Sequence, residues 1–366
     1  MTRPRVIVGM SGGVDSAVAA YLLKMAGYDV IGVTLKTWIS DDGKESRCCE
    51  INDAQRAASQ LDIPYHVLNC TQQFDSIVVG PFIDEYIGGR TPNPCIECNR
   101  ALKWERMLYF AGIMGAQYVA TGHYARIVKK ENGRVTVQRA VHAEKDQTYM
   151  LYRLSQEQLA STLMPLGNLS KDEVRHIAAT AGLDVADKKD SQEICFVTDG
   201  NYADFILDHA EGPIPREGYF VNEEGEILGK HKGIIHYTVG QRKGLGIAFG
   251  YPAFVKEIRP EENEIVIARE EALYGRSVRC ENVNFMSISG LEQGESLRCR
   301  ARIRYHHEAQ PALIRMCGEN RVQIDFDEPV RAATPGQSAV FYDEEECVIG
   351  GGVILPGRDH QEKEVL

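Results

Sequence analysis

The sequence predicts an α/β fold: an N-terminal Rossmann-like domain with a parallel sheet, then a small central β-rich domain and a C-terminal antiparallel β-barrel. Three observations predict it. Residues 5 to about 200 alternate short apolar runs with helical patterns, as in a parallel sheet covered on both faces. From about Ile214 onward, glycines, turn pairs and alternating residues indicate antiparallel sheet or barrel. A length of 366 residues suits two or three domains.

The expected elements of the N-terminal half follow one another as strand and helix. Residues 5–10 predict a buried strand, and apolar residues at helical spacing from Ala17 to Met25 predict a helix that ends near Gly27. Further strands are expected at residues 30–35, 65–68 and 118–120, with helices at 52–61 and 104–114. In the C-terminal half, strands are expected at residues 298–305, 322–326 and 338–342.

Composition and charge fit a folded globular protein and bear on its partners. The chain has 41 Lys and Arg against 52 Asp and Glu, a net charge of −11, which taken alone argues against a nucleic-acid binder. Two segments are nevertheless basic. Residues 228–256 hold five Lys or Arg and no Asp or Glu. Arg298, Arg300, Arg302 and Arg304 alternate along one expected strand and would share one face, either as an RNA contact or as a solvated strand face.

The apolar runs and the cysteines indicate the compartment. No apolar run approaches the roughly 20 residues that a membrane-spanning helix needs, and the N-terminus lacks the apolar core of a secretory signal. We therefore expect no membrane contact and a cytoplasmic protein, whose ten cysteines are mostly thiols. Closely spaced cysteines in that setting indicate metal binding or catalysis.

A glycine-rich run lies between the first expected strand and the first expected helix. It consists of Gly9, Met10, Ser11, Gly12, Gly13, Val14, Asp15 and Ser16. Glycines allow backbone N–H groups to converge on an anion, and the following helix adds its positive N-terminal end. The run lacks the ending of a Walker A loop and the pattern of a dinucleotide fold. The alternative is a glycine-rich turn with helix-capping residues.

This run resembles the signature of the PP-loop pyrophosphatases. Members of that family bind ATP and cleave it between the α- and β-phosphates, which releases pyrophosphate and leaves an adenylated substrate. The resemblance implies that the loop holds the pyrophosphate end of ATP. Asp15 would then have a Mg²⁺-linked role, since hard oxygen ligands suit that ion.

Two cysteines and two prolines lie close together in residues 91–99, Thr-Pro-Asn-Pro-Cys-Ile-Glu-Cys-Asn. The prolines predict a stiff extended loop that presents both thiols. Cys95 and Cys98 have C-x-x-C spacing and could clamp one metal ion, form a redox pair or make half of a structural zinc site. Cys195 lies in a separate run and could be a third functional thiol or an inert buried one.

Six further runs, together with the glycine-rich loop, resemble the tRNA-specific 2-thiouridylase family. They follow in order across nearly the whole chain, at residues 91–99, 120–124, 145–149, 188–191, 240–246 and 334–339. The resemblance implies an enzyme that uses ATP to activate the C2 oxygen of the wobble uridine of certain tRNAs and then replaces it with sulfur. It also implies a PP-loop catalytic domain at residues 1–207, a central tRNA-contacting domain at 208–274 and a tRNA-binding barrel at 275–366.

The same resemblance assigns roles to residues. Leu35 and Gly122 would complete the adenosine pocket beside residues 9–16, and Asp15 would be catalytic. Cys98 matches the catalytic nucleophile, and Cys195 matches the thiol that carries persulfide sulfur. Asn93, Pro94 and Cys95 would line the target base. The expected tRNA contacts are His123, Lys145, Asp146, Gln147, Arg304, Tyr305 and Gln337. Taken by itself, His123 after a strand fits a satisfied core histidine better than a functional one. The implied partners are the tRNA anticodon loop and a sulfur donor protein or inorganic sulfide.

One departure from the family bears on the mechanism. Better-known members have Asp where this chain has Cys95. In the two-thiol route, a Cys195 persulfide attacks the adenylated base and Cys98 closes a disulfide. With a third thiol, Cys95, Cys98 and Cys195 could instead hold a [4Fe–4S] cluster with one iron open for sulfide. The third cysteine favours the cluster.

Two competing functions remain at the level of sequence. One is another PP-loop adenylating ligase or amidotransferase acting on a small molecule, although amide ligation needs no sulfur carrier. The other is an ATP-binding or iron–sulfur module that regulates partners. RNA-dependent turnover of ATP distinguishes the expected enzyme from both.

Overall fold

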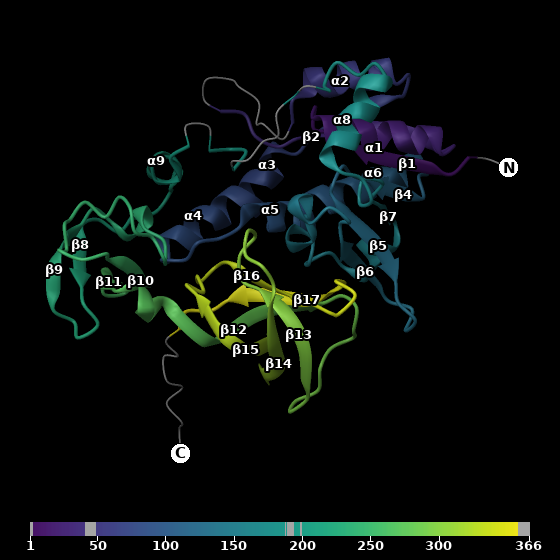
Figure 1. The fold of residues 1–366 in the computed structure, drawn as a ribbon. Coiled ribbons are helices and arrows are strands. Elements are labelled where there is room, and N and C mark those ends of the chain that lie inside the picture. Colours follow the sequence, from purple (N-terminus) through teal and green to yellow (C-terminus); the bar gives the residue numbers. More distant parts are fainter. Residues whose placement is uncertain (1–2, 41–48, 187, 189–193, 198–199, 358–366) are drawn as a thin grey trace. The chain divides into compact units, whose positions relative to one another are not determined.

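The computed structural model describes residues 3–40, 49–186, 188, 194–197 and 200–357 (Figure 1). These residues form two compact units. The first contains the described residues up to 79, together with residues 94–201 and 345–348. The second contains residues 80–93 and 202–344 and the described residues from 349 onward. Residues 80–93 therefore interrupt the sequence of the first unit and belong to the second unit. We call this segment the strap.

A five-stranded parallel sheet forms the centre of the first unit, as the alternating apolar runs predict. Its strands are β1 (Arg5–Gly9), β2 (Asp29–Lys36), β3 (Tyr65–Asn69), β4 (Tyr118–Ala120) and β7 (Thr162–Leu163), in the order β3-β2-β1-β4-β7. Strands β2 and β3 lie on one side of β1, and β4 and β7 lie on the other. The strand order therefore reverses between β1 and β4. Open α/β sheets bind ligands at such a reversal, beyond the carboxyl ends of the strands.

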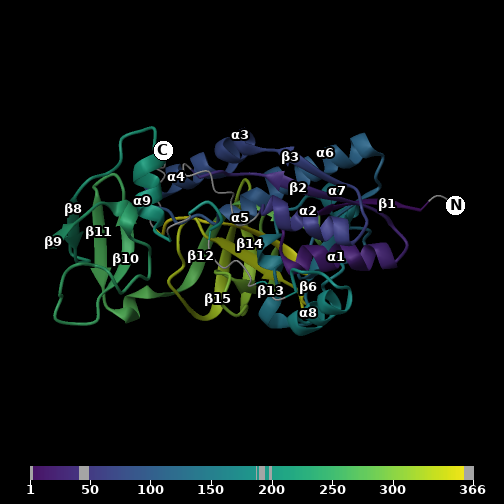
Figure 2. The ribbon, with the colours of Figure 1, turned by 90° about the horizontal axis from the view of Figure 1, so that it is seen from above.

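Helices cover this sheet because their apolar residues recur on one side. They are α1 (Val14–Met25), α2 (Ile51–Gln60), α6 (Trp104–Met114) and α8 (Lys171–Thr180), with the short helices α3 (Thr71–Phe74), α5 (Pro94–Glu97) and α7 (Gln156–Ala160). Val6 and Val8 of the central strand share a core with residues of α1 and α8. Figures 1 and 2 both show α1 and α8 side by side in this unit. A hairpin of β5 (Ala125–Lys129) and β6 (Val135–Arg139) completes it.

The second unit contains a four-stranded sheet and two helices. The strands are β8 (Gly218–Val221), β9 (Ile227–His231), β10 (Phe254–Arg259) and β11 (Glu264–Ala268), in the order β10-β11-β8-β9. Phe220 lies at the centre of their core, with Tyr237 and Val255 around it. The strap begins with α4 (Gly80–Ile87), which packs on α9 (Tyr202–His209): the rings of Tyr86 and Tyr202 are 4.6 Å apart.

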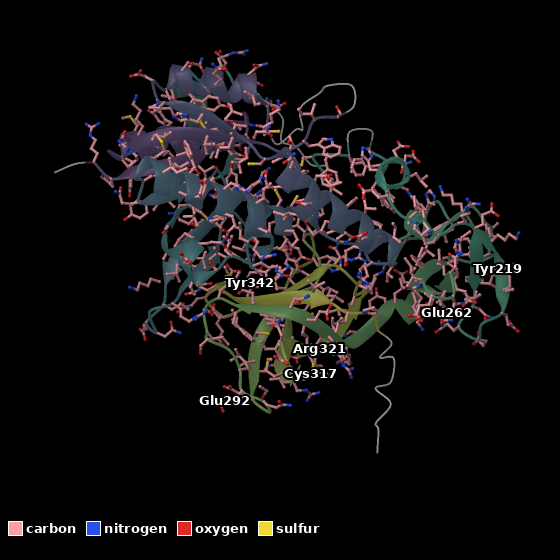
Figure 3. All side chains as sticks on the ribbon, turned by 180° about the vertical axis from the view of Figure 1, so that it is seen from behind. Tyr219, Glu262, Glu292, Cys317, Arg321 and Tyr342 are labelled. Atoms are coloured by element: carbon pink, nitrogen blue, oxygen red, sulfur yellow. The ribbon has the colours of Figure 1, made fainter. Side chains whose placement is uncertain are left out.

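A closed six-stranded antiparallel barrel forms the rest of the second unit. Its strands are β12 (Tyr274–Phe285), β13 (Ser296–Arg302), β14 (Gln310–Gly318), β15 (Arg321–Arg331), β16 (Ser338–Tyr342) and β17 (Val348–Ile354). Alternate residues fill its interior, such as Ile314, Ile324 and Phe341. Figure 3 labels Cys317 and Arg321 on either side of the turn that joins β14 to β15. The expected order of parallel sheet, small β-rich part and antiparallel barrel is confirmed.

Two local expectations are wrong. The strand expected at residues 298–305 ends at Arg302, because the chain turns there and the His307 N–H donates to the Arg304 carbonyl at 3.1 Å. Arg304 and Tyr305 therefore do not continue the alternation. The stiff loop expected at residues 91–99 becomes helical from Pro94. Proline fits the first turn of a helix, where its missing N–H would have no partner in the helix.

None of the helices in the described part of the chain combines the length and the apolar character that crossing a membrane requires.

Candidate functional site

The glycine-rich loop lies between the carboxyl end of β1 and the first turn of α1. The Ser11 N–H donates to Ser16 Oγ at 3.1 Å, and Ser16 Oγ donates to the Gly13 carbonyl at 3.1 Å. Gly13 caps α1 without a side chain, so the positive end of the helix faces the loop. These features are the ones that suit an anion at a helix N-terminus.

Two glycines allow the close approaches on which the loop depends. Gly12 has φ +83°, and a Cβ there would lie 2.6 Å from the Glu50 carbonyl oxygen. Gly122 follows β4, and a Cβ there would lie 2.7 Å from the backbone of Asp15 and Ser16. Gly122 therefore borders the loop. Leu35 lies near the carboxyl end of β2, the strand next to β1, and so at the same edge of the sheet.

Asp15, in the first turn of α1, is held by two side chains. Tyr124 donates its hydroxyl to Oδ1 at 2.7 Å, and the Lys171 ammonium lies 2.7 Å from Oδ1 and 2.8 Å from Oδ2. Lys171 is buried. Neither partner is predicted from the sequence. The available signal was a lysine in the first turn of a helix, directly after the N-cap Ser170, where the helix dipole disfavours a cation.

Lys188 forms a second ion-pair cluster at the loop. Its ammonium binds the carboxylates of Glu50 and Asp53 and donates to the Gly12 carbonyl at 3.1 Å. Burial by itself would lower the pKa of Lys188, but the hydrogen bonds and charges of Asp53 and Glu50 outweigh it, so the pKa is raised. The cluster ties the loop to the start of α2, because Glu50 is the residue before that helix. Lys189 to Ser191, from the same sequence run, lie outside the described residues.

The thiols at 95 and 98 lie on a helix rather than a loop. Pro94 opens α5, and Cys98 begins a π-helical segment, η2 (Cys98–Lys103), which continues into α6. Cys95 is exposed, whereas Cys98 is buried. Glu97, between them, pairs with Arg100 at 2.9 Å and also with Arg153.

Cys195 is also buried, and the aromatic ring of its neighbour Phe196 lies 5.6 Å from that of Phe74. Within the described part of the chain, the sulfur atoms of Cys95, Cys98 and Cys195 do not lie as a group within 4.8 Å of one another. They therefore do not form a preformed site for one metal ion. The ligands of a [4Fe–4S] cluster bind separate irons, so they lie farther apart than the ligands of a single metal ion. Three thiols also match the ligand type of such a cluster.

His123 follows β4 and packs beside the loop. Its Nδ1 lies 2.8 Å from Thr121 Oγ1, and its ring lies 5.7 Å from that of Trp104. Burial, with a smaller effect from the charge of Lys103, lowers the pKa of His123 to about 3. The imidazole is therefore neutral near pH 7.

Residues 145–147 form part of a turn that packs on the segment after β4. The carboxylate of Asp146 is buried and accepts from the Thr148 hydroxyl at 2.9 Å. Gln147 Oε1 accepts from the Tyr124 N–H at 2.9 Å. Lys145 is the last residue of the 3₁₀ turn η3 (Ala143–Lys145). Gln147 thus supports Tyr124, the residue whose hydroxyl reaches Asp15, while Asp146 stabilises the turn itself.

In the second unit, the strap is fixed to a turn of the barrel. The Thr91 N–H donates to the Pro335 carbonyl at 2.8 Å, and Gln337 Nε2 donates to the Thr91 carbonyl at 2.7 Å. A Cβ on Gly336 would lie 2.8 Å from the Thr91 nitrogen. Gln337, expected at the tRNA, therefore also holds the strap two residues before Asn93.

The guanidinium of Arg304 forms hydrogen bonds with other residues of the second unit. Its Nη2 donates to the carbonyls of Val239 at 2.9 Å and Ala332 at 3.0 Å, and to the hydroxyl of Thr334. Arg302 places its guanidinium 5.5 Å from the ring of Tyr305. Among the other barrel arginines, Arg298 pairs with Asp327 at 2.6 Å. The arginines expected to make one basic face therefore differ in their surroundings.

Comparison with known proteins gives matches along the whole chain. Residues 4–199 match the family described as tRNA methyl transferase HUP domain. Residues 203–269 match the tRNA methyl transferase PRC-barrel domain, and residues 276–354 match the aminomethyltransferase beta-barrel domain.

Full-length relatives are similar at about half of all positions. The tRNA-specific 2-thiouridylase MnmA of Lachnoclostridium phytofermentans is 52% identical over 359 residues, covering 96% of this chain and 99% of that protein. The protein of the same name from Clostridioides difficile is 51% identical over 356 residues, covering 96% and 98%.

Solved structures resemble about half of the chain. The U34-tRNA thiolase NcsA from Methanococcus maripaludis, with its [4Fe–4S] cluster, has a TM-score of 0.35 at 20% identity and covers 53% of this chain and 61% of its own. A 4-thiouridine synthetase–RNA complex with bound ATP has a TM-score of 0.34 at 18% identity and covers 51% and 43%.

Proposed function

The chain belongs to the tRNA-specific 2-thiouridylase family, and on that premise we propose that it thiolates the wobble uridine of tRNA anticodons at C2 at the expense of ATP. The observation that carries this is identity of about half over 96% of the chain to proteins of that name. ATP activates the C2 oxygen as an adenylate and releases pyrophosphate. Sulfur then displaces AMP, so the oxygen leaves with the phosphate.

The loop of residues 9–16 is the proposed site for the phosphates of ATP. Its support is the open N-terminus of α1 and the close packing of Gly122 on Asp15. Leu35 and Gly122 are the proposed neighbours of the adenosine. Mg²⁺ would accompany ATP. Asp15 is the proposed carboxylate directed toward it, and its ion pair with Lys171 orients that carboxylate.

Sulfur transfer is assigned to Cys98 and Cys195, with Cys95 as the third thiol. In the persulfide route, the outer sulfur of a Cys195 persulfide attacks C2 and AMP leaves. The Cys98 thiolate then attacks the Cys195 sulfur, which forms a Cys98–Cys195 disulfide and leaves the transferred sulfur on the base. An external reductant restores both thiols.

The alternative that we prefer is a [4Fe–4S] cluster on the same three thiols. The donor set fits such a cluster, since two of its cysteines lie three residues apart on a helix and two of the three are buried. When bound, the cluster would supply sulfide at its open iron. The protein's own contribution is to hold three thiolates and to keep water away from the buried pair.

The substrate is proposed to contact both units. Asn93, Pro94 and Cys95 would border the target base, and His123, Lys145, Asp146, Gln147, Arg304, Tyr305 and Gln337 would meet the tRNA. The proposed division of labour is a catalytic domain at residues 1–207, a central tRNA-contacting domain at 208–274 and a tRNA-binding barrel at 275–366. A sulfur donor protein or inorganic sulfide would supply sulfur in the cytoplasm.

The test is ATP–pyrophosphate exchange with and without tRNA, together with nucleoside analysis for 2-thiouridine. We expect exchange and thiolation that depend on tRNA. Cys98→Ala and Cys195→Ala should abolish thiolation while ATP binding is retained. Exchange that proceeds without RNA on a small amide or carboxylate would instead identify a small-molecule adenylating enzyme.

A further inference from the structure

An open cavity of about 450 Å³ lies in the second unit, lined by α9, the segment of residues 236–243 and the turn that follows β13. Its lining includes Tyr202, His236, Thr238, Gly240, Lys243 and Arg304. Most of these residues lie outside the positions assigned to ATP, sulfur or tRNA. A volume of this size falls at the lower end of the range for small-ligand pockets, roughly 300–1,000 Å³.

The cations of the second unit divide into paired and unpaired groups. Lys256 pairs with Glu223, Arg298 with Asp327 and Arg331 with Glu270. In the described part of the chain, Lys243 has no ion pair, and neither do Lys230, Lys232 and Arg242. Lys243 is exposed at the cavity, so its ammonium is available to a bound anion.

The wall of the cavity is rigid and positively charged. Arg304 fixes it through bonds to the Val239 and Ala332 carbonyls. Gly240 has φ +89°, and a Cβ there would lie 3.3 Å from Arg304 Nη2, so the backbone approaches the guanidinium directly. Arg304 and Lys243, the two cationic side chains in the lining, favour an anion at the cavity.

Two further lining residues, Tyr202 and His236, carry groups that suit a sugar. Tyr202 forms a side-chain hydrogen bond with Thr238. Burial lowers the pKa of His236, and the charge of Lys232 adds to this, while Asp204 acts in the opposite direction. A neutral imidazole has one donor and one acceptor, which matches the 2′-hydroxyl of ribose.

The cavity adjoins the strap that leads to the thiols. Thr91 Oγ1 donates to Thr238 Oγ1 at 3.4 Å, and Thr91 precedes Asn93 by two residues. Two extended residues span at most about 7 Å. A ligand in the cavity would therefore lie close to Asn93, which is the first of the proposed target-base residues.

We propose that this cavity binds a ribose–phosphate unit of the anticodon arm next to the target uridine, with Lys243 at the phosphate and His236 at the sugar. The inference rests on the proposed function, because it names where the same tRNA substrate is held.

The test measures the affinity of the full-length protein for tRNA, and for an isolated anticodon stem–loop, at several salt concentrations. Lys243→Ala should weaken binding of both RNAs several-fold. It should reduce the slope of log K against log salt by about 0.7, the value for one phosphate contact with a single strand. The matched control is Lys256→Ala, which removes a cation of the same segment that is paired with Glu223. It should leave the slope unchanged.

The possible results separate the cavity assignment from the proposed function. An unchanged slope for Lys243→Ala, with wild-type thiolation intact, overturns the cavity assignment and leaves the proposed function standing. An effect with tRNA that disappears with the stem–loop also overturns it, because the contact then lies outside the anticodon arm. A wild-type protein that does not bind tRNA overturns the proposed function and this inference together.

Discussion

The ammonium of Lys171 lies 2.7 Å from Oδ1 and 2.8 Å from Oδ2 of Asp15, and so joins the first turn of α8 to the first turn of α1. The two residues are 156 positions apart in the sequence. A lysine at the start of a helix opposes the helix dipole, and the carboxylate of Asp15 offsets that cost. The pair connects the glycine-rich loop to a helix that lies far from it in the sequence of the first unit.

Lys171→Met should leave the Asp15 carboxylate with Tyr124 alone. We expect the free energy of unfolding to fall by about 2 kcal/mol, since a partly buried charge loses its partner. ATP affinity should fall by about tenfold because the loop loses its support. The double variant Asp15→Asn/Lys171→Met should recover stability but not ATP binding. Urea denaturation and calorimetric titration with ATP separate the two effects, and equal recovery of both would contradict a role in the ATP site.

Arg304→Ala should destabilise the second unit. Its Nη2 serves three acceptors, and their loss is expected to cost about 1–3 kcal/mol. The control is Arg298→Ala, which removes an exposed guanidinium paired with Asp327 and should leave stability nearly unchanged. Urea midpoints of the two variants give the comparison. Equal midpoints would show that the internal bonds of Arg304 contribute little.

His123→Gln should flatten the loss of stability in acid. The pKa of His123 is about 3 in the folded protein against an ordinary value of 6.5, so between these values the unfolded state binds the extra proton. Stability therefore falls as the pH drops below 6.5, by up to about 1.4 kcal/mol per pH unit for this one group. Above pH 7 the histidine contributes no pH dependence. Urea midpoints at pH 7.5 and 5.5 test this, and parallel wild-type and variant curves would refute it.

Cys95→Asp distinguishes the two sulfur routes. Because Cys95 is exposed, the change should not affect folding. If the three thiols hold a cluster, anaerobically prepared Cys95→Asp should lose iron and acid-labile sulfide, together with thiolation. The control is Cys317→Ser, which alters an exposed cysteine of the barrel. It should retain the iron, the acid-labile sulfide and the thiolation activity. Retained thiolation by iron-free Cys95→Asp would favour the persulfide route.

The parallel sheet and the glycine-rich loop could be predicted from the sequence, because both depend on patterns of neighbouring residues. Continuous apolar runs such as residues 5–10 predict buried parallel strands, and β1 (Arg5–Gly9) follows that expectation closely. The glycines at 9, 12 and 13 likewise predicted the turn between β1 and α1, whereas its role as an anion site stays a prediction. Contacts between distant residues were not predictable, which is why Lys171 was missed. The pairing of Arg298 with Asp327 depends on which strands become neighbours, and alternation along one strand contains no information about that.

The π-helical segment η2 fixes the number of residues between Cys98 and Trp104. A π-helical turn holds one more residue than an α-helical turn, and such turns occur often at functional sites. Deleting one residue here would restore regular α-helix and rotate the thiol-bearing turn by about 100° relative to α6, with a shift of about 1.5 Å along the axis. The length of this stretch is therefore constrained together with the thiol of Cys98. Among descendants of this sequence, insertions and deletions should be absent here.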